Sequence, residues 1–204
     1  VQFFYGNQML NGPFVCLVLM PLAMIDGNCR FQTMDGKWHK IEGPWDMLIA
    51  HPPCTFITVS ANAYYNLQKY KDKAKRRYFD RYKAIVFFMQ LALVNCKKIA
   101  IENPVGIMSS AYRKPDQIIQ PYMFGHPYSK KTCLWLKNLP LLVATEIVKP
   151  EKIHSNGKSG GYSGASYFVR DENGKILPYG DPRTAKARSK TFPGIAKAMA
   201  EQWG

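Results

Sequence analysis

Several features that mark other classes of protein are scarce or missing in this sequence of 204 residues. The five cysteines are scattered and form no C-x-x-C pair, which argues against a zinc site and against a disulfide framework. The four histidines also lack the spacing of metal ligands. No run of about 18 uncharged apolar residues occurs, so we expect no membrane-spanning helix. Together these absences predict a metal-free protein of a reducing, cytoplasmic compartment.

Acidic residues are also scarce. The chain has 14 Asp and Glu against 28 Lys and Arg, which gives a formal net charge of +14. This imbalance favours a polyanionic partner such as nucleic acid, although a merely soluble basic surface is the alternative. The length suits one domain with a sizeable core, and we predict a single domain over residues 1–204.

Two short apolar runs, residues 47–50 and 99–101, predict strands that are buried on both faces. Residues 66–95 lie between them and predict one long helix, because apolar side chains recur at three- and four-residue spacing. Strand, helix and strand in this order indicate the βαβ unit of a parallel sheet. The predicted core-facing stripe of the helix is Tyr70, Ala74, Tyr78, Tyr82, Ile85, Phe88 and Met89. The opposite, basic face carries Lys69, Lys73, Arg76, Arg77 and Lys83.

Weaker patterns predict the remaining elements. The apolar residues 14–24 suggest a buried strand. A secretory signal peptide is the less favoured interpretation, since no basic region precedes these residues and no cleavage-site pattern follows them. Residues 29–41 predict a β-hairpin that turns at Asp35-Gly36. Residues 132–136 predict another strand, and residues 193–203 predict a terminal helix.

Both apolar runs end in residues that are able to do chemistry. Cys54 follows the first run behind two prolines, and Glu102 and Asn103 follow the second. The carboxyl ends of parallel strands form the edge at which open α/β sheets bind ligands. A thiolate at Cys54 could add to C6 of a pyrimidine, and a protonated Glu102 could stabilise the charge that develops at N3. The alternatives are a small buried cysteine and a structural ion pair or helix cap.

The pairing resembles the cytosine-C5 DNA methyltransferases, whose nucleophile lies in a Pro-Cys motif and whose acid lies in a Glu-Asn motif. The small phage and prophage members are the most similar, and the matching segments are residues 45–55, 100–105, 120–139 and 190–204. The resemblance implies an α/β, Rossmann-like S-adenosylmethionine-dependent methyltransferase sheet with a short target-recognition region at about residues 122–183. It also implies methyl transfer to C5 of cytosine in DNA through a covalent adduct. We expect a monomer without membrane contact, in the cytoplasm of a bacterium or a phage-infected cell.

The resemblance assigns roles to individual residues. Cys54 would be the nucleophile and Glu102 the acid, while Asn103 and Lys131 would bind the substrate. Lys131 matches the first basic position of the family's Arg-x-Arg strand, and Cys133 stands at the second. The residues placed beside S-adenosylmethionine are Pro53, Ser189 and Thr191.

One family feature is missing from the sequence. The glycine-rich turn after the first strand, which cradles the methionine part of the cofactor, has only weak candidates at residues 5–7 and 11–14. We therefore expect a sheet that is incomplete at its N-terminus, and weak binding of S-adenosylmethionine. A degenerate, non-catalytic DNA-binding relative and a C5-modifying enzyme of free cytidine nucleotides remain open as alternatives.

Overall fold

The computed structural model describes residues 2–5, 8–11, 15–17, 30–32, 38–40, 46–150, 171–175, 177, 181–183 and 191–204. The chain divides into two compact units. The first consists of Val1–Ile118, Thr132–Leu141 and Gly204, and the second of Ile119–Lys131 and Leu142–Trp203.

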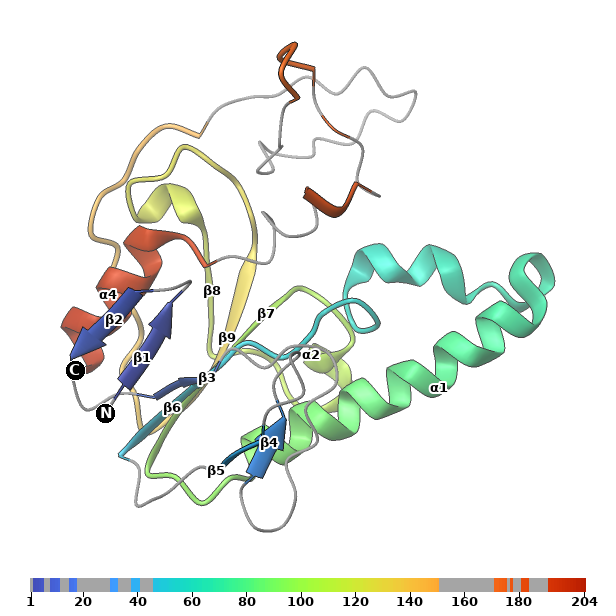
Figure 1. The fold of residues 1–204 in the computed structure, drawn as a ribbon, viewed down its shortest axis with the longest axis horizontal. Helices are drawn as coiled ribbons and strands as arrows, with labels where there is room; N and C mark the ends of the chain where they lie inside the picture. The colour runs from blue at the N-terminus through green and yellow to red at the C-terminus, as the bar shows by residue number, and fades with distance from the viewer. Residues whose placement is uncertain are drawn as a thin grey trace. The chain divides into compact units, whose positions relative to one another are not determined.

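The first unit is built on a five-stranded mixed sheet with the strand order β3-β6-β7-β9-β8 (Figure 1). Strands β3, β6 and β7 run parallel to one another, and β9 runs antiparallel to β7. The strands are β3 (Val15–Leu17), β6 (Met47–Ala50), β7 (Lys98–Pro104), β8 (Gln117–Ile119) and β9 (Thr132–Lys137). All four residues of β6 are buried, as its continuous apolar run predicted. The fold class is therefore α/β, and the sheet is compatible with a Rossmann-like fold.

Helix α1 (Leu67–Ala92) connects β6 to β7 and completes the predicted βαβ unit. Asn66 caps it by accepting a hydrogen bond from the backbone N–H of Lys69 at 2.9 Å. The prediction of one uninterrupted helix was wrong at Lys71, where a φ of 44° breaks the helical backbone.

The core-facing stripe of α1 was also predicted too long. Tyr78 and Tyr82 are 47% and 64% exposed, because only the C-terminal end of α1 packs on the sheet (Figure 1). Near the C-terminal end, Phe88 and Leu91 are fully buried and belong to the same apolar cluster as Trp135 of β9. The rings of Phe88 and Trp135 meet edge to face at 5.1 Å, so this half of the helix is the one that packs on the sheet.

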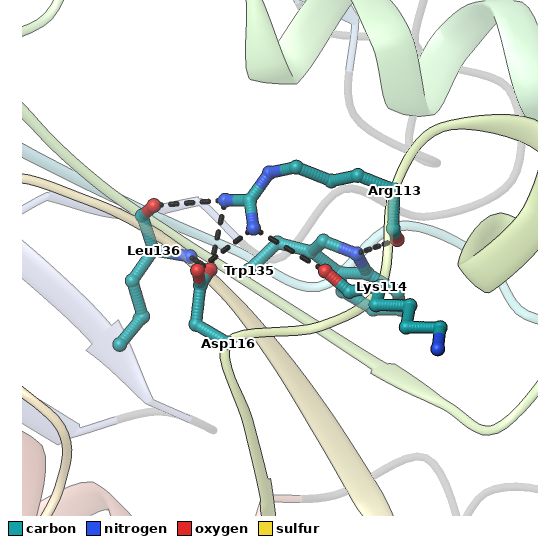
Figure 2. Close-up of polar contacts among 5 residues, drawn as sticks. All are labelled: Arg113, Lys114, Asp116, Trp135 and Leu136. Carbon is teal, nitrogen blue, oxygen red and sulfur yellow. Dashed lines mark hydrogen bonds and ion pairs between the residues drawn. The ribbon is translucent and has the colours of Figure 1, made fainter.

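A polar network fastens the segment after helix α2 (Met108–Ala111) to strand β9 (Figure 2). Arg113 donates to Leu136 O at 2.9 Å and pairs with Asp116 at 2.8 Å, and Trp135 Nε1 donates to Arg113 O at 2.8 Å. Asp116 accepts the backbone N–H of Leu136 at 2.6 Å. Hydrogen bonding to Asp116 raises the pKa of Arg113. Burial alone would raise the pKa of Asp116, but the hydrogen bonds from Arg113 and Leu136 outweigh it and lower that pKa.

Two antiparallel pairs accompany the sheet in the first unit. Strands β4 (Arg30–Gln32) and β5 (Trp38–Lys40) form the predicted hairpin, whose turn lies outside the described residues. Strands β1 (Gln2–Tyr5) and β2 (Gln8–Asn11) form a second pair that the sequence did not predict. Of the predicted strand at residues 14–24, the structure describes β3 alone.

In the second unit, a short 3-10 helix η2 (Pro121–Met123) precedes the terminal helix α4 (Pro193–Trp203), whose bounds are those that the sequence predicted. His126 Nε2 accepts a hydrogen bond from the backbone N–H of Gly194 at 2.9 Å. This N–H lies in the first turn of α4, where backbone N–H groups have no partner within the helix. At its other end Gln202 bonds both backbone groups of Val143. None of the helices among the described residues is long and apolar enough to cross a membrane.

Candidate functional site

The candidate site lies where β6 and β7 end side by side. Their parallel register pairs Ala50 with Ile101, so the next residues, His51 and Glu102, emerge next to each other. His51 Nδ1 lies 2.9 Å from Glu102 Oε2, and the two side chains are 15% and 12% exposed. One position further along β7, the buried Asn103 donates from Nδ2 to the carbonyl oxygen of Pro52 at 2.7 Å. The segment before Cys54 is thus bound, through Pro52, directly to the strand that carries Glu102.

The chain turns sharply after Cys54. The Cys54 carbonyl oxygen accepts hydrogen bonds from the backbone N–H groups of Ile57 and Thr58, both at 3.1 Å. The 3-10 helix η1 (Val59–Tyr65) then follows. Sequence reasoning placed the start of a helix at residues 55–62 that would help to ionise the thiol, and the structure has this turn and 3-10 helix instead.

The loop after Cys54 is joined to the loop after Glu102. Val59 donates to Val105 O at 3.0 Å, and Ile107 donates to Ile57 O at 2.8 Å. Gly106 permits this approach, since a Cβ there would lie 1.9 Å from Ile57 O. The backbone around Cys54 and the backbone after Glu102 therefore form one hydrogen-bonded platform.

Two arginines of α1 hold the same loop from the helix side. Arg81 donates from Nε to Phe56 O at 2.9 Å, and its guanidinium carbon lies 3.5 Å from the centre of the Tyr65 ring. Arg77 lies over the rings of Phe56 and Tyr64, both at 5.1 Å. The sequence placed Arg77 on the basic face of the helix, opposite the core, whereas the structure packs it against aromatic rings.

The three cysteines with described side chains differ in access. Cys54 is partly exposed, while Cys96 and Cys133 are buried. Cys133 is fully buried, and burial raises the pKa of its thiol. Cys133 pairs in register with Asn103 and belongs to the apolar cluster of the core. A cysteine fits this position because it behaves as a small apolar residue when it is buried. Among these three thiols, Cys54 is the one that a substrate can reach.

The other predicted site residues have different surroundings. Pro53 is half-buried beside Cys54. Lys131 is exposed directly before β9, and Thr191 is half-buried just before α4; both belong to the second unit. Ser189 lies outside the described residues. The structure brings His51 into contact with Glu102, and Pro52 into contact with Asn103.

Sequence reasoning missed the roles of His51, Gly106 and Arg81. His51 had a detectable signal, because it follows β6 at the position where Glu102 continues β7, and in-register parallel strands place such residues side by side. The roles of Gly106 and Arg81 depend on contacts with residues 49 and 25 positions away, which leave no local pattern.

The chemistry of these groups suits a pyrimidine base. A thiol can serve as a nucleophile, a carboxyl group as an acid, and an amide as a hydrogen-bonding partner. This set alone would not hold S-adenosylmethionine, because Glu102 is its only acidic side chain and the ribose hydroxyls need another; a methyl donor would have to be held by residues outside the set. Within the described part of the chain, no group of three or more His, Cys, Asp or Glu side chains could hold a metal ion.

No protein-family model matches this chain, and no curated protein matches it in sequence.

Proposed function

We propose that this chain modifies C5 of cytosine in DNA through a covalent bond between Cys54 and C6, with S-adenosylmethionine as the methyl donor. The observation that carries the proposal is the in-register ending of β6 and β7, where Asn103 ties the Pro-Pro-Cys segment to the strand that bears Glu102. A nucleophile that must reach C6 and an acid that must reach N3, on opposite sides of one ring, need such a fixed separation.

The thiol supplies what cytosine lacks, since C5 is a poor nucleophile. Addition of the Cys54 thiolate to C6 forms a C–S bond and moves an electron pair toward N3, which takes a proton from the Glu102 carboxyl. C5 then has enamine character and can attack an electrophile. Loss of the added proton from N3, loss of the C5 hydrogen as a proton and expulsion of the thiolate restore the ring. When bound, S-adenosylmethionine supplies an electrophilic methyl group.

The surroundings of Glu102 support its role as an acid. Its side chain is 12% exposed, and removal from water favours the neutral, proton-carrying form of a carboxyl group. The fixed loops support the role of Cys54, because a nucleophile held by a hydrogen-bonded platform loses little freedom on reaction.

The charge of the chain supports DNA as the partner. A net charge of +14 favours contacts with phosphates, whose binding releases counterions. A cytosine inside a duplex cannot reach a thiol at the end of a strand, so the base must leave the stack.

The test is a duplex with 5-fluorocytosine in place of cytosine, incubated with the chain and millimolar S-adenosylmethionine. Fluorine cannot leave as a cation, so the thioether persists after methyl transfer and the protein–DNA adduct survives a denaturing gel. A shifted band that is present in the wild type and in Cys133→Ala but absent in Cys54→Ala supports the proposal. A band that persists in Cys54→Ala shows that another group is the nucleophile.

A further inference from the structure

His51 and Glu102 form a contact between two titratable side chains at the strand ends. The proposed mechanism gives a role to Glu102 but none to His51. The two residues come from adjacent parallel strands, and the distance between Nδ1 and Oε2 is 2.9 Å. Both side chains are largely withdrawn from water, where an isolated charge is costly. A proton shared between an imidazole and a carboxyl group lowers this cost, because the two groups then carry either opposite charges or none.

The elements packed around the pair bring few other ionisable groups. On β9, the register partner of Glu102 is the buried Leu134, and that of Asn103 is the neutral, buried thiol of Cys133. On the other side, β3 places Leu17 opposite Ala50, the residue before His51. The loop after β6 adds Cys54. Lys131 precedes β9 but belongs to the second unit.

We propose that His51 is a positioning residue that orients the Glu102 carboxyl and holds the proton with which it is recharged. This inference rests on the proposed function. When N3 takes the proton that the pair shares, a carboxylate and a neutral imidazole remain. His51 then takes a proton from solvent, to which its side chain is 15% exposed, and shares it with Oε2, so that Glu102 can again act as an acid.

The first test does not depend on catalysis. The side chain of His51 is titrated by NMR in the wild type and in Glu102→Gln, with its signal assigned from His51→Asn. Loss of the carboxylate should lower the pKa of His51, because an imidazolium without its counter-charge is less stable. The NMR signal of His126, which accepts a hydrogen bond from Gly194 in the second unit, is the internal control and should be the same in both proteins. An unchanged titration of His51 overturns the inference.

The second test measures the exchange of the cytosine hydrogen at C5. In the adduct, C5 can take a proton from water instead of a methyl group, so reversal of the addition releases tritium from C5 without any cofactor. His51→Asn keeps an N–H group near the position of Nδ1 but cannot titrate. We expect it to retain the melting temperature of the wild type and to release tritium roughly tenfold more slowly at the top of the pH range, with a smaller deficit at low pH.

The outcomes separate the two proposals. Equal pH profiles of tritium release in His51→Asn and wild type overturn the role of His51, whatever the NMR titration gives. A wild-type chain that releases no tritium refutes the proposed function and the catalytic role of His51 together, while the NMR titration still shows whether the pair shares a proton. A uniform loss at all pH values, together with a lower melting temperature, shows a structural residue and also overturns the inference.

Discussion

Asn103 donates a hydrogen bond from Nδ2 to the carbonyl oxygen of Pro52 at 2.7 Å, and this bond joins the two segments that carry the candidate nucleophile and acid. Asn103 is 2% exposed, so neither partner can turn to water instead. Proline has no backbone N–H with which to bond a neighbouring strand, so the carbonyl oxygen is the backbone group through which Pro52 can be held.

Replacement of Asn103 by alanine removes this fastening. We expect Asn103→Ala to lower the free energy of unfolding by about 2 kcal/mol, because the Pro52 carbonyl loses its partner in a buried place. Urea unfolding measures the effect. Asn95→Ala is the matched control, since Asn95 is exposed, and it should change stability by less than about 0.5 kcal/mol. Equal effects of the two substitutions would show that the Asn103 bond does not fix the site.

Gly106 tests the joined loops. A Cβ at this position would lie 1.9 Å from Ile57 O and 2.9 Å from Thr58 Cα, which are backbone atoms that cannot rotate away. Gly106→Ala should therefore separate the loops and lower the melting temperature by several degrees, as a loss of about 2 kcal/mol implies. Gly174→Ala is a useful comparison, because a Cβ there would meet no atom within 4 Å and the substitution carries only the backbone cost of a positive φ of 74°. If Gly174→Ala costs as much as Gly106→Ala, steric contact between the loops is not the cause.

The network around Asp116 predicts a dependence of stability on pH. The folded-state pKa of Asp116 lies below its ordinary value of 3.8, so its contribution to stability is present above that value and is lost as the pH falls through the folded pKa. Asp116→Asn should cost about 1 kcal/mol at neutral pH, a modest figure because the group is partly exposed. Urea unfolding of both proteins across the acid range measures the difference. If the difference in unfolding free energy between the two proteins stays constant down to the lowest pH, the loss does not come from the charge of Asp116.

Binding to DNA should depend strongly on salt. With a net charge of +14, we expect the affinity for duplex DNA to fall at least about tenfold between about 50 and about 200 mM salt, because bound phosphates release counterions. Fluorescence anisotropy with two duplexes of unrelated sequence measures both the salt slope and the sequence preference. Little difference between the duplexes is expected. An affinity that does not change with salt would remove the main support for a nucleic-acid partner.

The elements that could be predicted from sequence are those whose pattern is local. The buried strand β6, a helix between β6 and β7, and the bounds of α4 each follow from patterns of neighbouring residues, and these three features are confirmed. The break at Lys71 had no such signal, because lysine is an ordinary helix residue and the positive φ is set by the surrounding chain. The exposure of Tyr82 was missed for a related reason, since periodicity shows which face of a helix is apolar but not how far the sheet extends beneath it.

The candidate site was predicted in its residues but not in its contacts. Cys54 and Glu102 could be named because they end apolar runs, whereas the pairing of His51 with Glu102 required the register of β6 on β7. Arg81 acts on the Cys54 loop from 25 residues further along the chain, a distance that no short motif spans.

The most direct test of the central claim is the release of tritium from DNA whose cytosines are tritiated at C5, measured without S-adenosylmethionine. Addition of Cys54 to C6 is sufficient for this release, so binding of the methyl donor plays no part in the result. We predict release by the wild type and by Cys133→Ser, no release by Cys54→Ser, and release at least about 100-fold slower in Glu102→Gln with an unchanged melting temperature. Undiminished release by Cys54→Ser, or release from free cytidine nucleotides but not from DNA, would contradict the account.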